Sequence, residues 1–197
     1  TGDAGAGKTT LALEFLRRAE ARQADLVAAV ALGDPQTGAS DPYLIFREVL
    51  AQLTGDVEAR LAQGAITEEG ARRVQGALRK SLDCLLEFGP DLVGLLVPGA
   101  GVAVRLAKLG VETSKRAGLA EKLTQAPAAA RPDVPGQKGL DQGQIFEQYA
   151  KVLNALAKHA PLLLILDDLQ WADNASTDLL FHLARRTESS RIFIIAL

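Results

Sequence analysis

The residues near the start of the chain, Gly2 to Thr9, have the types and spacing of a loop that binds phosphate groups. They read GDAGAGKT, which matches the pattern G-x-x-x-x-G-K-[ST] at every fixed position. The glycines of such a loop let successive backbone N–H groups point inward at a polyphosphate. We expect Lys8 to reach the β and γ phosphates and the Thr9 hydroxyl to ligate an accompanying Mg²⁺. The residues predicted to bind the nucleotide are Gly2, Asp3, Ala4, Gly5, Ala6, Gly7, Lys8, Thr9 and Thr10.

Two adjacent carboxylates lie far downstream, directly after a short apolar run. Residues 162–166 read LLLIL, which is typical of a buried parallel strand, and Asp167 and Asp168 follow. Ligands of open α/β sheets collect beyond the carboxyl ends of the strands. We therefore expect Asp167 to hold Mg²⁺ through its water shell and Asp168 to polarise an attacking water. Asp168 and the phosphate-binding Lys8 are the predicted catalytic residues. Taken alone, two such acids are equally consistent with a solvated turn, but their pairing with the upstream loop favours the site.

The residues that follow the acid pair have simple structural interpretations. Asp173 can cap the next helix by accepting hydrogen bonds from its free N–H groups. Trp171 is expected to pack the loop under the acid pair rather than to contact a ligand. Arg185 and Arg186 lie at the end of that helix, where their positive charges interact favourably with the negative end of the helix dipole. We prefer this interpretation to that of an arginine finger.

Composition excludes several classes of partner. The net charge of −2 argues against broad contact with nucleic acid or with an acidic membrane surface. Residues 92–104 are uncharged, but they are too few for a membrane span and include Pro98. Cys84 is the single cysteine, so no internal disulfide can form and we expect a reducing, cytoplasmic compartment. We interpret Cys84 as a small apolar residue on a helix rather than as a nucleophile.

Helical patterns alternate with apolar runs along the chain and predict an α/β fold with a parallel sheet between two layers of helices. Predicted strands are 25–32, 162–166 and 192–197; predicted helices are 8–22, 43–53, 67–88, 101–123, one beginning at Asp141, and 174–186. In helix 8–22, Leu11, Phe15 and Ala19 follow one another at fourfold spacing. Asp41 and Pro42 are placed as cap and first-turn residue of helix 43–53.

This pattern suggests one partial domain over residues 1–197. We expect its core in residues 1–54 and 141–197, a helical insertion at about 55–125, and a proline-rich connector at 126–139. The chain starts at Thr1, contains no Met, and ends inside an apolar run. We therefore expect it to be a segment of a longer protein, truncated at both ends of its fold.

Three stretches resemble the origin-recognition-like AAA ATPase domain of STAND-type signalling proteins, such as large LuxR-type regulators and ATP-binding proteins with tetratricopeptide repeats. Residues 162–186, LLLILDDLQWADNASTDLLFHLARR, resemble its Walker B segment, and GDAGAGKTTL resembles its Walker A. DPYLIFR, residues 41–47, resembles the segment after its second strand. The chain differs from this family at Ile45, where proline is frequent, and at Gln170, where histidine is commoner.

The resemblance implies a P-loop NTPase fold of the AAA/ASCE type with strand order 5-1-4-3-2, so that the three predicted strands here are neighbours. It implies Mg²⁺ and ATP as cofactors. The choice of adenine over guanine rests on the resemblance alone, because the sequence shows no base-specifying motif. It further implies a switch with slow hydrolysis, acting on effector and repeat domains of the same longer chain, with possible nucleotide-dependent self-association. A scaffold that binds ATP without turnover is the alternative, because Asp168 is shorter than the Glu of many AAA proteins. A small-molecule kinase and a DNA-loading ATPase are weaker alternatives.

Overall fold

A three-stranded parallel sheet forms the centre of the structure, a computed structural model that describes residues 6–35, 42–54, 72, 80–81, 83–85, 87–89, 92 and 141–197. The strands are β1 (Val27–Leu32), β2 (Leu162–Asp167) and β3 (Ile192–Ala196), and they lie in the order β1-β2-β3. Val27 pairs with Leu162 and Leu32 with Asp167, while Leu162 also pairs with Ile192. The predicted neighbourhood of the three strands is therefore confirmed.

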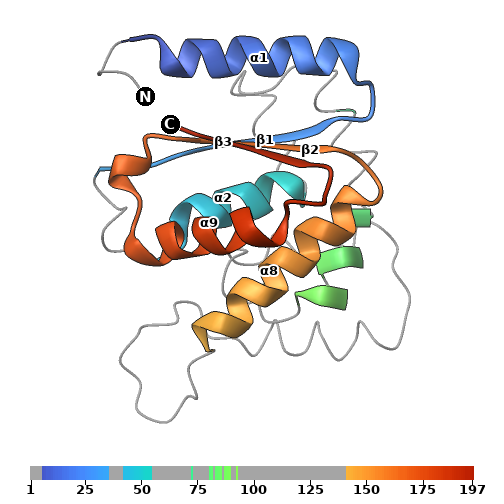
Figure 1. Ribbon diagram of the computed structural model, residues 1–197, viewed down its shortest axis with the longest axis vertical. Coiled ribbons are helices and arrows are strands. Elements are labelled where there is room, and N and C mark those ends of the chain that lie inside the picture. The colour runs from blue at the N-terminus through green and yellow to red at the C-terminus, as the bar shows by residue number, and fades with distance from the viewer. Residues whose placement is uncertain are drawn as a thin grey trace.

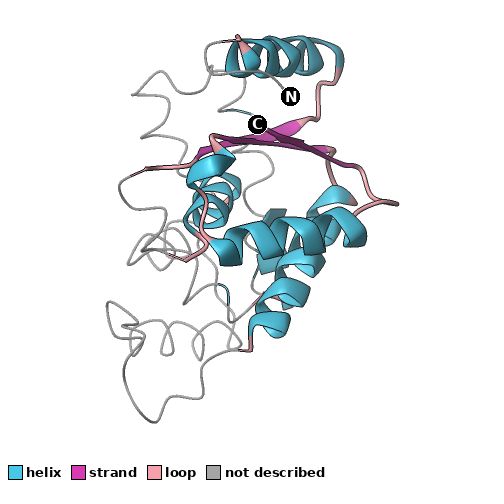
Figure 2. Cartoon of the chain, turned by 60° about the vertical axis from the view of Figure 1, so that its left-hand side comes forward, coloured by secondary structure: helices cyan, strands magenta, loops and turns pink. Residues whose placement is uncertain are grey.

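Helices cover both faces of this sheet (Figure 1). The helix α1 (Lys8–Arg22) lies along one face; α2 (Leu44–Leu53), α8 (Gln142–Ala157) and α9 (Asn174–Arg186) lie on the other. Figure 2, viewed from another side, shows the same layers, with α1 above the strands. The predicted three-layer α/β arrangement is confirmed for the described residues. Both α1 and α9 have the predicted bounds.

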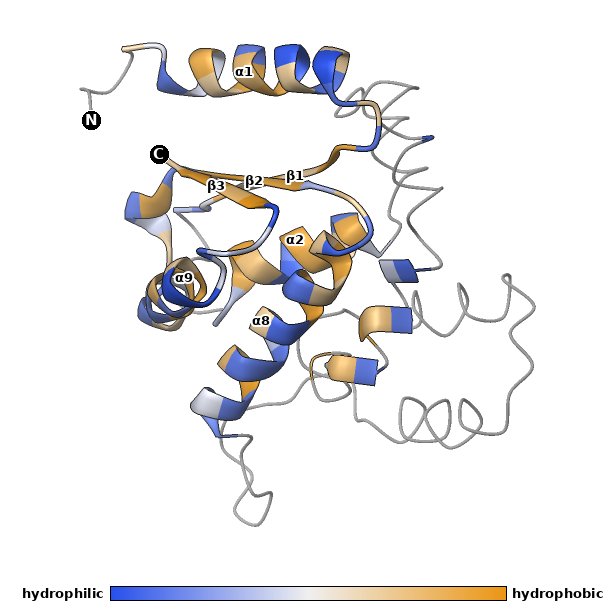
Figure 3. Ribbon diagram, turned by 45° about the vertical axis from the view of Figure 1, so that its right-hand side comes forward, coloured by the Kyte–Doolittle hydropathy of each residue, from blue (hydrophilic) through white to orange (hydrophobic). Residues whose placement is uncertain are grey.

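The position of β2 in the centre of the sheet explains why the five residues before Asp167 are all apolar rather than alternating with polar ones. All six of its residues are buried. Leu162, Leu164 and Leu166 belong to the core under α2, α8 and α9. Leu163 and Ile165 pack on the other face with Ala12 of α1. Since helices cover both faces, the five residues before Asp167 need apolar side chains, and hydrophobic colours predominate on the strands in Figure 3.

The face of α1 that packs on the sheet differs from the apolar series noted in the sequence. Ala12 is buried, with Leu16 and Ala19 packed beside it, whereas Leu11 is 73% exposed. Phe15 lies partly outside the contact, and its ring packs against that of Phe193 on β3, with centroids 5.7 Å apart. The face of α1 that contacts the sheet is thus shifted by one residue, from Leu11 and Phe15 to Ala12 and Leu16. The small side chains of Ala12 and Ala19 allow the helix to approach the strands closely.

On the opposite face, a buried tyrosine connects two helices. The Tyr149 hydroxyl of α8 donates to the carbonyl oxygen of Phe46 in α2 at 2.9 Å, and the two rings meet edge to face. Burial raises the pKa of Tyr149 well above its usual value, so the hydroxyl stays a donor. The hydrogen bond lets a full aromatic side chain be buried without an unsatisfied polar atom.

Much of the predicted insertion lies outside the described residues. Those described between 72 and 88 are helical, as the predicted helix 67–88 requires, and Cys84 and Leu85 are buried in the core. Burial raises the pKa of the Cys84 thiol, in keeping with its interpretation as an apolar residue. Helix 101–123 and the connector 126–139 fall wholly outside the described residues. Where the structure does describe helices, none is long and apolar enough to cross a membrane.

Candidate functional site

The fold brings the start of α1 and the end of β2 together, although they are far apart in sequence. The Thr9 hydroxyl donates a hydrogen bond to Oδ2 of Asp167 at 2.6 Å across 158 residues of chain. Asp167 is the last residue of β2, and Thr9 is in the first turn of α1. The two elements thus converge at the carboxyl edge of the sheet, where ligands of such folds bind.

The start of α1 presents backbone donors beside this contact. Gly7 precedes the helix with φ of +79°, a left-handed conformation that favours glycine. No acidic residue occupies the first turn, so the positive end of the helix dipole is left for an external anion. Thr9 and Thr10 are exposed at this end and Lys8 is half-buried. Of the predicted nucleotide-binding residues, Ala6 to Thr10 are described here, whereas Gly2, Asp3, Ala4 and Gly5 lie outside the described residues.

The Asp167 carboxylate is buried and held in one orientation. Its side chain is 4% exposed. Oδ2 accepts from Thr9, and Oδ1 accepts from the backbone N–H of Asp168 at 2.9 Å. Among the described residues no basic side chain forms an ion pair with it. A buried carboxylate that has hydrogen-bond donors but no countercharge is a suitable place for a cation.

The atoms at this position fit Mg²⁺. They are a hydroxyl oxygen and a carboxylate oxygen on adjacent elements. In the part of the chain that the structure describes, no three His, Cys, Asp or Glu side chains gather as a closed metal cage. Mg²⁺ is typically bound by one or two protein oxygens together with phosphate oxygens and water. Thr9 and Asp167 would therefore hold the ion alongside a bound polyphosphate.

Asp168 is placed differently from its neighbour. It is exposed, and its backbone has φ of 55° and ψ of 42°, in the left-handed region. This turn ends β2 and starts the short 3₁₀ helix η1 (Leu169–Trp171). The side-chain amide of Gln170 donates to Oδ1 of Asp168 at 2.8 Å. Non-glycine residues in this backbone region are uncommon and cluster at functional sites.

The structure also locates the residues after the acid pair. Asp173 caps α9 as predicted, with Oδ1 accepting from the Ser176 N–H at 2.9 Å. Trp171 is 47% exposed, and its packing under the acid pair stays a prediction. Arg186 forms an ion pair with Glu147 at 2.5 Å, which supports a structural role for the end of α9.

Two contacts near the site were not foreseen. One is the hydrogen bond from Gln170 to Asp168. The other joins Asp173 to the start of α2, where Oδ2 accepts from the backbone N–H of Tyr43 at 3.1 Å. The prediction of Asp41 as cap and Pro42 as first-turn residue was wrong, because α2 begins at Leu44 with Tyr43 as its N-cap, φ of 62°, and Pro42 lies before the helix. Asp41 itself lies outside the described residues. The sequence indicates that Asp173 caps α9, but only the fold shows that its second carboxylate oxygen, Oδ2, bonds to the start of α2.

Comparison with known proteins adds one match. The model of the family described as AAA ATPase domain matches residues 1–195. No curated protein and no solved structure matches the chain significantly. The match covers both the start of α1 and the end of β2, and therefore all residues of the site described above.

Proposed function

Since the chain belongs to the AAA ATPase domain family, we propose that it binds Mg²⁺ and ATP and acts as a nucleotide-dependent switch with slow ATP hydrolysis. The observation that carries the proposal is the 2.6 Å contact between Thr9 and Asp167. It joins a helix start rich in backbone donors to a buried carboxylate at the edge of the sheet. A triphosphate with a divalent cation has the two charges that these groups complement.

Each residue of the site has a proposed role. Lys8 and the backbone of residues 2–10 would bind the phosphates, and Thr9 and Asp167 would hold the metal. The metal, when bound, would neutralise charge on the β and γ phosphates. Asp168 is exposed beside this position and would orient a water for attack. Its hydrogen bond from Gln170 would keep the carboxylate in one rotamer.

The wider context is also part of the proposal. We place a P-loop core in residues 1–54 and 141–197, with a helical insertion at about 55–125 and a connector at 126–139. The switch would act in the cytoplasm within a multidomain signalling or transcription-regulatory protein, through effector and repeat domains and possibly self-association. The physical route is a change of domain arrangement that depends on the γ-phosphate.

A scaffold that binds ATP without turnover is the second candidate. It is favoured by the short side chain of Asp168 and by the engagement of its Oδ1 with Gln170. Both features limit how far the carboxylate can extend toward a water beside the γ-phosphate.

Measurements on the full-length protein separate these possibilities. Binding of a fluorescent ATP analogue and release of phosphate are compared for the unmodified protein, Lys8→Ala and Asp168→Ala. Lys8→Ala should weaken binding about tenfold or more, because it removes a charged donor to the phosphates. Asp168→Ala should keep binding but lower kcat about 100-fold, the contribution typical of a general base. Lys151→Ala and Asp178→Ala, exposed residues on α8 and α9, are matched controls that should change neither quantity.

Each outcome decides between functions. No binding of nucleotide by the unmodified protein would overturn the proposal. Binding with equal phosphate release from the unmodified protein and Asp168→Ala would favour the scaffold. Transfer of the γ-phosphate to a small molecule rather than to water would favour a kinase.

A further inference from the structure

The loop that carries the acid pair is pressed against the end of the neighbouring strand at Gly33. β1 and β2 run in register up to the pair Leu32 and Asp167. The next residue on the β1 side, Gly33, continues the ladder by donating its N–H to the carbonyl oxygen of Asp167 at 2.9 Å. Gly33 is itself buried.

The contact leaves no room for a side chain at position 33. A Cβ atom built there would overlap the carbonyl oxygen of Asp168 and lie 3.3 Å from Cβ of Trp171. The overlapping atom belongs to the backbone, so it cannot rotate away as the end of a flexible side chain would. Any residue other than glycine would therefore displace either the end of β1 or the peptide that follows Asp168.

The acid-pair loop has little freedom to yield, because the other neighbouring strand holds it too. The Leu169 N–H donates to the carbonyl oxygen of Leu197 at 3.0 Å, and the Leu197 N–H donates to Leu166 at 2.9 Å. Asp168 thus turns between Gly33 on one side and Leu197 on the other. This confinement accounts for its left-handed backbone, φ of 55°, which an unsupported aspartate seldom adopts.

The backbone of Asp168 in turn orients the carboxylate of Asp167. Its N–H donates to Oδ1 of Asp167 at 2.9 Å, which leaves Oδ2 directed at Thr9. A displacement of the Asp168 peptide would therefore change the position of both carboxylates. Misplacement of a catalytic group by about 1 Å can cost on the order of 100-fold in rate.

From this geometry we infer that Gly33 is a positioning residue for the acid pair. It would act through the backbone: its missing side chain lets β1 set the left-handed turn at Asp168, and through it the orientation of Asp167. The inference rests on the proposed function, since it concerns the rate at which that site works. It predicts that a single methyl group at position 33 impairs hydrolysis and the use of Mg²⁺ more than the binding of nucleotide.

Three glycine-to-alanine variants of the full-length protein test it. In Gly33→Ala, we expect kcat to fall about tenfold or more and the Mg²⁺ concentration for half-maximal activity to rise, since both carboxylates move. Binding of a fluorescent nucleotide measured without Mg²⁺ should change less than about twofold, because the start of α1 is unaffected.

The other two variants control for stability. Gly143→Ala adds a methyl group in the first turn of α8, where the nearest atom is the end of the Asp141 side chain at 3.3 Å. Gly89→Ala adds one in the core, 2.8 Å from Val152, and should lower the melting temperature without a selective loss of kcat. A Gly33→Ala protein whose kcat per nucleotide-binding site equals that of Gly89→Ala would overturn the inference.

A measurement on the unmodified protein keeps the test decisive even if Gly33→Ala does not fold. The α protons of Gly33 should show a nuclear Overhauser effect to the β protons of Trp171, and its absence would overturn the inference. Failure of the unmodified protein to bind ATP would instead refute the proposed function, while this contact could still be observed.

Discussion

The side-chain amide of Gln52 pairs with the backbone of Val30 as though it were part of a neighbouring strand. The Val30 N–H donates to Oε1 of Gln52 at 2.7 Å, and Nε2 of Gln52 donates to the Val30 carbonyl oxygen at 2.5 Å. Glu48, one turn earlier in α2, accepts from the Leu32 N–H at 3.3 Å. These contacts lie on the side of β1 away from β2. The helix α2 therefore packs on the sheet and also supplies hydrogen-bond partners to the backbone of Val30 and Leu32 at the edge of β1.

We expect Gln52→Leu to destabilise the protein and to promote self-association. Gln52 is 3% exposed, so the variant leaves two backbone groups of Val30 without partners at a cost of about 2–3 kcal/mol. An uncovered strand edge is also a template for pairing with another chain. Denaturant unfolding and concentration-dependent light scattering measure the two effects. Gln144→Leu, an exposed glutamine of α8, is the matched control; if both variants behave alike, the pairing has no energetic role.

The contrast between Gln52 and the acid pair shows what can be predicted from this sequence. The apolar run before Asp167 and the glycines before Lys8 carry local signals, and the rule that ligands bind at the carboxyl edge brings the two together. Both ends of α9 were predicted because Asp173 and Arg186 carry cap and dipole signals.

The contacts that escaped prediction have no such local signal. Gln52 reads as one more polar residue on an amphipathic helix, and only the packing of α2 beside β1 shows its role. Gly33 reads as part of a Gly-Asp-Pro turn, and only the sheet register shows that the Asp168 backbone lies against it. The fourfold spacing of Leu11, Phe15 and Ala19 does not identify the inward face of α1, where Ala12 is buried and Leu11 exposed, because periodicity does not distinguish between adjacent apolar stripes.

Replacement of Thr9 should alter the dependence on metal. We expect Thr9→Val, which keeps the shape but loses the hydroxyl, to raise the Mg²⁺ concentration for half-maximal ATPase activity about tenfold. Thr9→Ser retains the hydroxyl that donates to Asp167 and should stay near the unmodified protein. Titration of activity with Mg²⁺ after removal of metal by a chelator measures both. Equal Mg²⁺ requirements for the Val and Ser variants would remove Thr9 from the metal site.

Asp173 should stabilise the protein through both of its oxygens. Asp173→Ala removes the cap of α9 and the acceptor for the Tyr43 N–H, so we expect a loss of about 2–4 kcal/mol in the free energy of unfolding. Asp173→Asn can keep the cap through Oδ1 but turns an NH₂ group toward Tyr43. The loss of stability in Asp173→Asn should therefore be intermediate and report the contacts of Oδ2, which accepts from the Tyr43 N–H and from the Ser176 hydroxyl. Asp178→Ala on the same helix controls for charge; an Asn variant as stable as the unmodified protein would show that the contacts of Oδ2, including the link to α2, contribute nothing.

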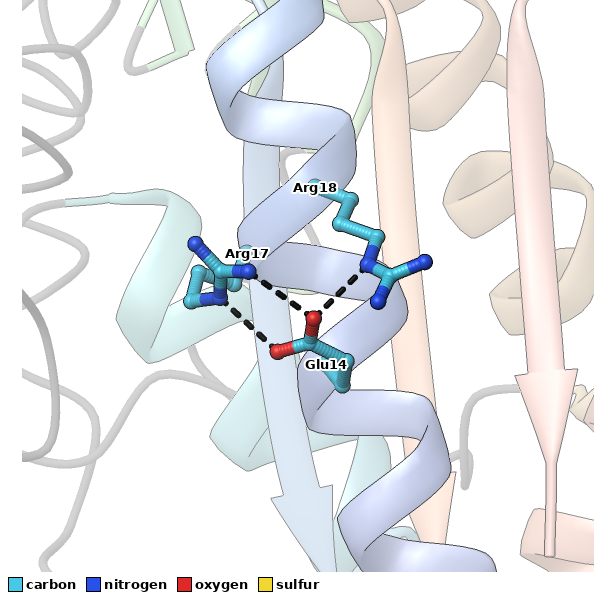
Figure 4. A network of polar contacts seen from close by, with 3 residues as sticks. All are labelled: Glu14, Arg17 and Arg18. Atoms are coloured by element: carbon cyan, nitrogen blue, oxygen red, sulfur yellow. Dashed lines mark hydrogen bonds and ion pairs between the residues drawn. The ribbon is translucent and has the colours of Figure 1, made fainter.

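Glu14 should titrate at an unusually low pH. Its carboxylate lies between the guanidinium groups of Arg17 and Arg18, at 2.8 and 2.7 Å (Figure 4). Hydrogen bonds from Arg17 first, and then from Arg18, lower the pKa of Glu14 from 4.5 to about 2. Because the folded pKa lies below the unfolded one, the ionised side chain stabilises the fold fully above about pH 4.5, and this contribution disappears as the pH falls toward 2.

The contribution is small, since all three side chains are exposed and salt screens them. Titration of the Glu14 carboxyl carbon by NMR at low ionic strength should find it still ionised at about pH 3.5, where an ordinary glutamate is mostly protonated. With Arg17→Gln and Arg18→Gln combined, the midpoint should return toward 4.5, the value without these partners. A midpoint near 4.5 in the unmodified protein would mean that water competes successfully for both guanidinium groups, and that the contacts drawn in Figure 4 contribute no measurable free energy in solution.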